Sequence, residues 1–164
     1  MLQRKVSPDE MCRIVDSPSG PPVLVFLCDS KDRRGLADRI RRAAKSRRTR
    51  VLALGDEDLG SFERRFAELL SDEPGTSTLD SGEPAPGDGL LTSLNRLSSS
   101  GRLVTILIIG YEHISCPAVH QTMVRILDFA PTELRTVFLA GDIPPVAIPR
   151  LLVRQRAEVY RIGP

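Results

Sequence analysis

Short blocks of apolar residues alternate along the chain with stretches whose apolar residues recur every three or four positions. The first pattern is typical of strands buried on both faces of a sheet, and the second is typical of helices packed on one face. The predicted strands, in chain order, are Val23–Cys28, Val51–Leu54, Leu103–Ile109, Val137–Ala140 and Glu158–Ile162. We therefore expect five strands joined by helices.

Helical spacing and helix-end signals place the connecting elements. Ser7 and Glu10 form a capping-box pattern, which predicts the start of a short first helix. The segment Ser17–Pro22 contains three prolines and should end that helix. Further helices are expected at Gly35–Ser46, Ser61–Ser71, Leu90–Leu97, Pro117–Phe129 and Val146–Val153.

This alternation predicts an α/β fold, a three-layer sandwich in which helices cover both faces of a mostly parallel five-stranded sheet. The length of 164 residues fits a single domain, residues 1–164. The segment 72–89 interrupts the pattern, because it is rich in Pro, Gly, Ser, Thr and acidic residues and has no periodicity. We interpret it as an exposed, flexible acidic loop.

The amino-acid composition argues against several classes of protein. An apolar fraction of 41% supports a packed core, whereas five Phe, two Tyr and no Trp argue against an aromatic platform for single-stranded nucleic acid. No apolar run approaches the roughly 20 residues of a membrane helix, and no secretory signal is visible. Three cysteines without framework spacing indicate reduced thiols. We expect a cytoplasmic protein with no membrane partner.

The turn after the first predicted strand, where α/β sheets bind ligands, lacks phosphate-binding features. A phosphate-binding loop needs several glycines and a Lys followed by Ser or Thr. The segment from Cys28 to Gly35 contains one glycine, and Asp29 and Asp32 would repel a polyphosphate. The dinucleotide pattern G-x-G-x-x-G occurs nowhere in the chain. This turn is not expected to hold a nucleotide in the usual way.

Three segments nevertheless follow a known order of elements. PPVLVFLCDSKDRRGLADRIRRA (Pro21–Ala43) stands in the place of a Walker A strand, loop and helix, and LLTSLNRLSSSGRLVTILIIGYEHI (Leu90–Ile114) in that of a helix and Walker B strand. AVHQTMVRILDFAPTELRTVFLAGDIPP (Ala118–Pro145) is similar to the following helix and sensor strand. From Pro21 to Pro164 the layout resembles P-loop ATPases of the AAA type, particularly the general-secretion-pathway branch and the STAND signalling ATPases.

The departures from that family pattern bear on activity. Arg33 and Arg34 stand about where the family has Gly-Lys, and Gly35 where it has Ser or Thr. Gly110 stands at the position of the aspartate that coordinates Mg²⁺. Glu112 could orient a water molecule, but without the lysine and the metal ligand it has nothing to act on. The resemblance therefore implies a pseudo-ATPase with no catalytic residues and no cofactor.

A receiver-like or flavodoxin-like domain has nearly the same alternation of elements, and the order of strands separates the two folds. In the P-loop class the first strand lies between the fourth and fifth, whereas in a receiver it lies between the second and third. Asp29 could then be an acidic pocket residue, but Gly110 again replaces the expected aspartate. Both interpretations predict an inactive site.

Charge is unevenly distributed although the net charge is only +2. Ten basic and two acidic residues lie between Lys31 and Arg50, and ten acidic and two basic residues between Asp56 and Asp88. Such segments are either two solvated faces or surfaces that steer a charged partner. The candidate partner-binding residues are Arg33, Arg34, Arg41, Arg42, Lys45 and Arg48.

Three functions are compatible with these features. The first is an inactive module that binds a protein, such as an active ATPase or a signalling effector, in regulation. The second is an atypical nucleotide-binding switch in which Arg33 and Arg34 replace the lost lysine beside Glu112, since guanidinium groups bind phosphate well. The third is an accessory protein whose arginines contact nucleic-acid phosphates, although no helix-turn-helix pattern supports it.

Cysteine and histidine residues offer two weaker alternatives. His113, Cys116 and His120 are spaced so that one helical face could hold all three, as in a mixed zinc set, but a fourth ligand is missing. Cys116 with either histidine, or Cys28 near Lys31, could form a reactive thiol site. No orienting group or oxyanion hole accompanies them, so we predict neither a metal site nor a catalytic thiol.

Overall fold

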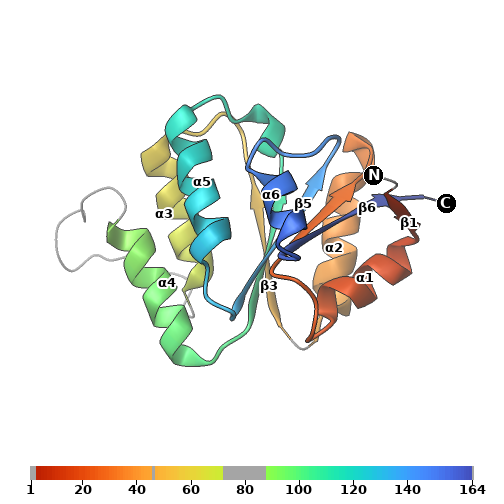
Figure 1. Ribbon diagram of the computed structural model, residues 1–164, viewed down its shortest axis with the longest axis horizontal. Coiled ribbons are helices and arrows are strands. Elements are labelled where there is room, and N and C mark those ends of the chain that lie inside the picture. Colours follow the sequence, from red (N-terminus) through yellow and green to blue (C-terminus); the bar gives the residue numbers. More distant parts are fainter. Residues whose placement is uncertain (1–2, 46, 72–87, 164) are drawn as a thin grey trace.

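The computed structural model of the protein describes residues 3–45, 47–71 and 88–163. These residues form one sheet of parallel strands in the order β1-β6-β2-β5-β4-β3, with helices on both faces (Figure 1). The strands are β1 (Arg4–Val6), β2 (Val23–Leu27), β3 (Arg48–Ala53), β4 (Val104–Ile109), β5 (Leu134–Ala140) and β6 (Ala157–Ile162). The helices are α1 (Pro8–Asp16), α2 (Arg33–Ala43), α3 (Leu59–Leu70), α4 (Asp88–Ser100), α5 (Pro117–Phe129) and α6 (Ile148–Val153).

The sheet separates two apolar cores, as the alternation of side chains along β2 illustrates. Leu24 and Phe26 pack with residues of α1 and α2, whereas Val23, Val25 and Leu27 pack in the core that α3, α4, α5 and α6 cover. Figure 1 shows α1 and α2 on one side of the sheet and the other four helices on the opposite side. The predicted three-layer α/β sandwich with a parallel sheet is confirmed.

The number and order of strands refine that prediction. The sheet has six strands and not the expected five, because residues 4–6 form β1 beside β6. Only Val6 of this edge strand is buried, so its sequence carries no apolar block. The first predicted strand, β2, pairs with β5 and β6, which are the fourth and fifth predicted strands. A receiver-like order, with this strand between the second and third, is not the order found.

Other boundaries differ where polar residues belong to a strand or a helix. β3 begins three residues before the predicted Val51, and β5 three residues before the predicted Val137. α4 includes Asp88, Gly89 and the whole serine run to Ser100, so residues 88 and 89 are helical and not part of the predicted loop. The rest of that loop, residues 72–87, lies outside the described residues.

A buried arginine anchors the connection between α1 and β2. The Arg135 side chain, 1% exposed on β5, donates hydrogen bonds to four backbone carbonyls. Nη1 contacts the oxygens of Val15 (2.6 Å) and Ser17 (2.7 Å), Nη2 that of Gly20 (3.1 Å) and Nε that of Pro21 (3.2 Å). Burial lowers the pKa of Arg135 to about 10, so it keeps its charge at neutral pH. This clamp positions the start of β2.

The length and apolar character of the helices bear on whether any of them could span a membrane. Within residues 3–45, 47–71 and 88–163, no helix combines the length and the apolar character that crossing a bilayer requires.

Candidate functional site

The candidate site lies at the carboxyl ends of β2 and β4, where parallel α/β sheets bind ligands. After β2 the chain passes through Cys28 and Asp29 into a 3-10 turn, Ser30–Asp32, and Arg33 is the first residue of α2. After β4 a second 3-10 turn, Tyr111–His113, carries Glu112. The two turns therefore bring Arg33 and Glu112 to the same edge of the sheet.

Arg33 is buried and forms an ion pair across this edge. Its residue exposure is 8%, and Nη1 donates a hydrogen bond to Oε1 of Glu112. A Cβ atom on Gly141, which follows β5, would lie 2.8 Å from Nη2 of Arg33, so the guanidinium packs directly over that glycine. Nε is buried and has no hydrogen-bond partner among the described residues. Arg33 thus fills the space between the ends of β2, β4 and β5.

The environment of Glu112 favours its charged form. Partial burial alone would raise the pKa of this carboxyl, but a backbone hydrogen bond, Arg33 and His113 together hold the pKa below its usual value. The carboxylate is 43% exposed, whereas its partner guanidinium is nearly enclosed. The Glu112 carboxylate is therefore ionised at neutral pH, and solvent reaches the pair mainly on its carboxylate side.

A pocket of about 370 Å³ lies on the other side of Arg33, toward β6. Two carboxylates, Asp29 and Asp32, and two guanidinium groups, Arg33 and Arg161, line it. Their formal charges cancel, so this pocket has no excess of positive charge for a polyphosphate. The Cys28 thiol is half-buried at its wall; burial raises its pKa, an effect that Arg33 only partly opposes. Cys28 is therefore a protonated thiol.

Gly110 at the end of β4 has a backbone conformation that disfavours any side chain. Its φ angle is +83°, in the left-handed region, and an added Cβ would lie 2.4 Å from the carbonyl oxygen of Leu54. Placing a carboxylate at this position would require the backbone of β4 or of the β3 exit to move. The end of β4 is therefore closed to a side chain at position 110.

The histidines and Cys116 do not share a helical face. His113 belongs to the turn before α5, and Cys116 is the N-cap residue of that helix. Nδ1 of His120 lies 2.9 Å from the hydroxyl of Tyr111, whose ring is buried edge-on against Phe138. Among the described residues, no three His, Cys, Asp or Glu side chains are grouped as a metal site would require.

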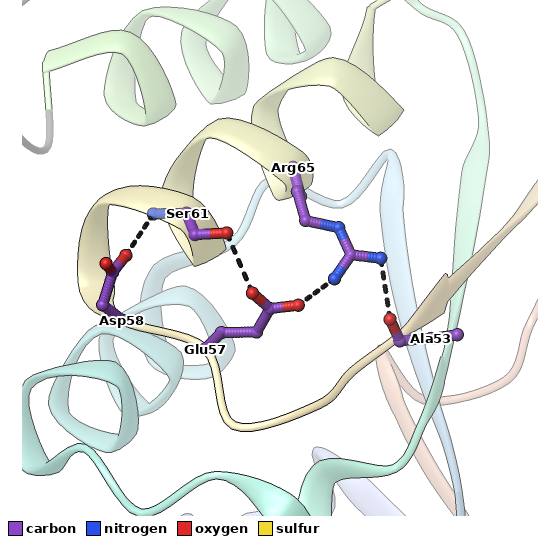
Figure 2. A network of polar contacts seen from close by, with 5 residues as sticks. All are labelled: Ala53, Glu57, Asp58, Ser61 and Arg65. Carbon is purple, nitrogen blue, oxygen red and sulfur yellow. Dashed lines mark hydrogen bonds and ion pairs between the residues drawn. The ribbon is translucent and has the colours of Figure 1, made fainter.

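A network of polar side chains closes the end of β3 (Figure 2). The Asp58 carboxylate caps α3 by accepting the backbone N–H of Ser61 at 2.7 Å, and the Ser61 hydroxyl donates to Glu57 at 2.8 Å. Arg65 pairs with Glu57 and donates from Nη2 to the carbonyl oxygen of Ala53 at 2.7 Å. The sequence analysis missed this network, although an Asp just before an apolar-periodic segment is a signal for a helix N-cap.

One more contact links the end of β3 to the turn after β4. The Asp56 carboxylate accepts hydrogen bonds from the backbone N–H (3.1 Å) and hydroxyl (2.7 Å) of Ser115. These bonds hold the pKa of Asp56 below its usual value. The polar residues at this end of β3 therefore bind one another or the neighbouring turn.

The predicted partner-binding arginines are divided by the fold. Arg33 is buried, unlike the other candidates, because α2 starts earlier than predicted and turns its first residue inward. The remaining candidates are exposed, namely Arg34, Arg41, Arg42, Lys45 and Arg48. Arg41 pairs with Asp38 at 3.1 Å. Of the three predicted nucleotide-site residues, Arg33 and Glu112 meet, and Arg34 lies on the exposed side of α2.

No model of a known protein family matches the chain, and no curated protein is significantly similar to it in sequence.

Proposed function

We propose that this chain is a catalytically inactive P-loop ATPase-like module that binds a protein partner in regulation or signalling. The order of strands supports the fold part of the proposal. Without β1, the predicted strands run fifth, first, fourth, third, second across the sheet, which is the order expected for this class. This order supports the proposal that the first predicted strand and the turn after it correspond to a Walker A segment.

The observation that carries the proposal is the Arg33–Glu112 ion pair. Arg33 follows β2 where the resemblance puts the phosphate-binding lysine, and it is buried against Glu112 and Gly141 instead of facing a ligand. A nucleotide phosphate at this position would have to displace the Glu112 carboxylate, whose charge repels it. The closed backbone at Gly110 argues against a metal ligand on β4. Both features favour a module without hydrolysis.

The exposed arginines supply the recognition part of the proposal. Arg34, Arg41 and Arg42 project from α2, and Lys45 and Arg48 follow it toward the edge of the sheet. Arg41 is partly neutralised by Asp38. A basic surface on a rigid sheet fits an acidic protein face, because complementary charge increases the rate of association and selects the partner.

A thermal-shift titration with Mg-ATP, Mg-ADP and Mg-GTP tests this proposal. We expect the melting temperature to stay unchanged at millimolar nucleotide. A ligand at one hundred times its Kd would add about 2.7 kcal/mol to the free energy of unfolding. For a domain of this size that is roughly 5–10 °C.

Two variants decide what any shift would mean. A shift that disappears in Arg33→Ala but persists in the exposed control Arg42→Ala would replace the inactive module with the nucleotide-binding switch. A shift that persists in both variants would place a nucleotide elsewhere and would also contradict the proposal. Calorimetry on the same samples separates binding from nonspecific stabilisation by anions.

A further inference from the structure

The two outer strands of the sheet differ in length and in exposure. β1 has three residues, whereas β3 has six and, among the described strands, pairs only with β4. Every residue of β2 and β5 is buried, but in β3 only Leu52 is. β3 contains no proline or glycine, so nothing in its sequence interrupts an extended backbone. β3 is therefore a long, regular sheet edge.

The hydrogen bonds at its ends show which backbone groups of β3 face outward. Arg48 donates its N–H to Leu103 O at 2.9 Å, and Leu54 donates to Ile109 O at 2.8 Å, both toward β4. Successive residues of a strand point their N–H and C=O groups to alternate sides. The backbone groups of Thr49, Val51 and Ala53 therefore face away from β4.

Only one of these outward groups has a partner among the described residues. The carbonyl oxygen of Ala53 accepts the hydrogen bond from Arg65 that Figure 2 shows. Within the part of the chain that the structure describes, no hydrogen bond from another residue reaches the outward N–H or C=O of Thr49 or Val51. These four groups, with the N–H of Ala53, form a template for one more strand.

Basic side chains surround this template. Arg48 and Arg50 belong to β3 itself. On α2, Arg39 pairs with Asp9 of α1 and so marks the flank that faces α1. Measured in the same sense around the helix axis, Arg34 and Arg41 lie about 220° and 200° from Arg39, on the flank away from α1. Because α2 packs against both α1 and β3, that flank is on the side of the β3 edge.

We propose that the edge of β3 binds an extended, acidic segment of a partner protein, which pairs with Thr49 and Val51 as an additional strand. Backbone hydrogen bonds would supply affinity and the arginines selectivity, as in other cases of strand addition. A second copy of this chain fits less well, because two β3 strands would bring Arg48 and Arg50 against the same residues. This inference rests on the proposed function, since it names the surface and the segment used for recognition.

The first experiment uses a peptide of alternating Glu and Val, seven residues long, with the full-length protein at low salt. Amide exchange followed by NMR should show fast exchange at Thr49 and Val51 in the free protein and slow exchange at Arg50 and Leu52. The peptide should slow exchange at Thr49 and Val51 at least tenfold. Unchanged exchange at these two amides under saturating peptide would overturn the proposal.

Matched peptides separate strand addition from attraction between charges. The same peptide with alternate amides methylated keeps its charge but loses half of its backbone donors, and should bind about tenfold more weakly. A peptide with Lys in place of Glu should not bind. Equal affinity of the methylated and unmethylated peptides would overturn the proposal.

Protein variants supply the complementary test. Val51→Pro removes an outward N–H without touching a bond to β4, and Arg50→Glu reverses a charge on the strand. Each should weaken peptide binding about tenfold while melting remains cooperative. Lys5→Glu, the same charge change on the opposite edge strand β1, should leave the affinity unchanged. Equal weakening by Lys5→Glu would show that net charge alone binds the peptide and would overturn the proposal.

Other outcomes distinguish this inference from the proposed function. Two results would overturn the edge proposal, because each would mean that something else binds the β3 edge. The first is tighter binding of a 20-base-pair DNA than of the peptide, and the second is dimerisation that protects Thr49 and Val51. A nucleotide shift lost in Arg33→Ala would overturn the proposed function and leave the peptide result standing. Absence of both a nucleotide shift and peptide protection would overturn only the edge proposal.

Discussion

Two buried arginines act at opposite ends of the sheet through different partners. Arg135, near the amino ends of the strands, donates only to neutral backbone carbonyls. Arg33, at the carboxyl ends, is paired with a carboxylate that solvent reaches. Removing Arg135 leaves several buried acceptors without donors, whereas removing Arg33 leaves a charge that water can solvate. The two positions should therefore respond differently to mutation.

Truncation of Arg135 should be strongly destabilising. We expect Arg135→Ala to lower the free energy of unfolding by about 3–4 kcal/mol, because it orphans the carbonyls of the α1–β2 connection and leaves a cavity. Arg135→Lys should recover only part of this, since an ammonium group cannot reproduce the planar fork of donors. Urea unfolding measures both.

The exposed residue Arg125 on α5 is the matched control for this prediction. Arg125→Ala should change the free energy of unfolding by no more than about 0.5 kcal/mol. Similar urea midpoints for the Arg135→Ala and Arg125→Ala variants would mean that the carbonyl clamp contributes nothing to stability.

The Arg33–Glu112 pair should make stability depend on acid pH. The folded-state pKa of Glu112 lies below its ordinary value of 4.5, so the unfolded chain binds more protons in that range. The contribution of Glu112 is therefore complete above about pH 4.5 and is lost as the pH falls through the lower, folded-state pKa. Glu112→Gln should show a smaller fall in melting temperature between pH 7 and pH 3.5. An unchanged fall would contradict the prediction.

At the scale of the elements, the sequence predicts best those strands that are buried on both faces of the sheet. The apolar runs of β2 and β4 and the Pro-initiated α5 were predicted to within a residue, because their patterns are local. β1 and the first half of β3 lie at sheet edges, where polar residues are tolerated, so they carry no apolar signal. β5 was shortened in the prediction because Arg135, a core residue, has the chemistry of a surface residue.

The candidate site was predictable only in part. The absence of a phosphate loop and the unusual glycine at position 110 are visible in the sequence. The contact between Arg33 and Glu112 joins residues 79 positions apart, and it depends on which strand ends are neighbours. The burial of Arg33 depends on where α2 begins, and helix ends are the least certain feature of a periodic pattern.

The turn that ends β4 can be tested with a pair of glycine substitutions. Gly110→Ala should lower the free energy of unfolding by about 2–4 kcal/mol, because the left-handed backbone is strained and the new Cβ would meet Leu54 O. Gly35→Ala, in α2 with open space around it, should instead stabilise the protein by about 0.5–1 kcal/mol. Thermal melts compare them; a neutral Gly110→Ala would contradict the assigned strain.

At the scale of the whole molecule, the alternation of strands and helices is compatible with more than one sheet order. That order depends on the neighbours of β2, and both β5 and β6 are more than one hundred residues away in sequence. No local pattern encodes such a pairing, which is why the sequence left two folds open. The sheet order is also what brings the turn after β2 beside the turns after β4 and β5, and so defines the site.

The pairing of β1 with β6 also has a consequence for biosynthesis. Arg4, Lys5 and Val6 are synthesised well before Tyr160, Arg161 and Ile162, which are their neighbours in the sheet. β1 must therefore remain unpaired while β2 to β6 are translated. A nascent chain can pair β2, β3, β4 and β5 before β6 is made, so β1, although synthesised before them, is the last strand to dock.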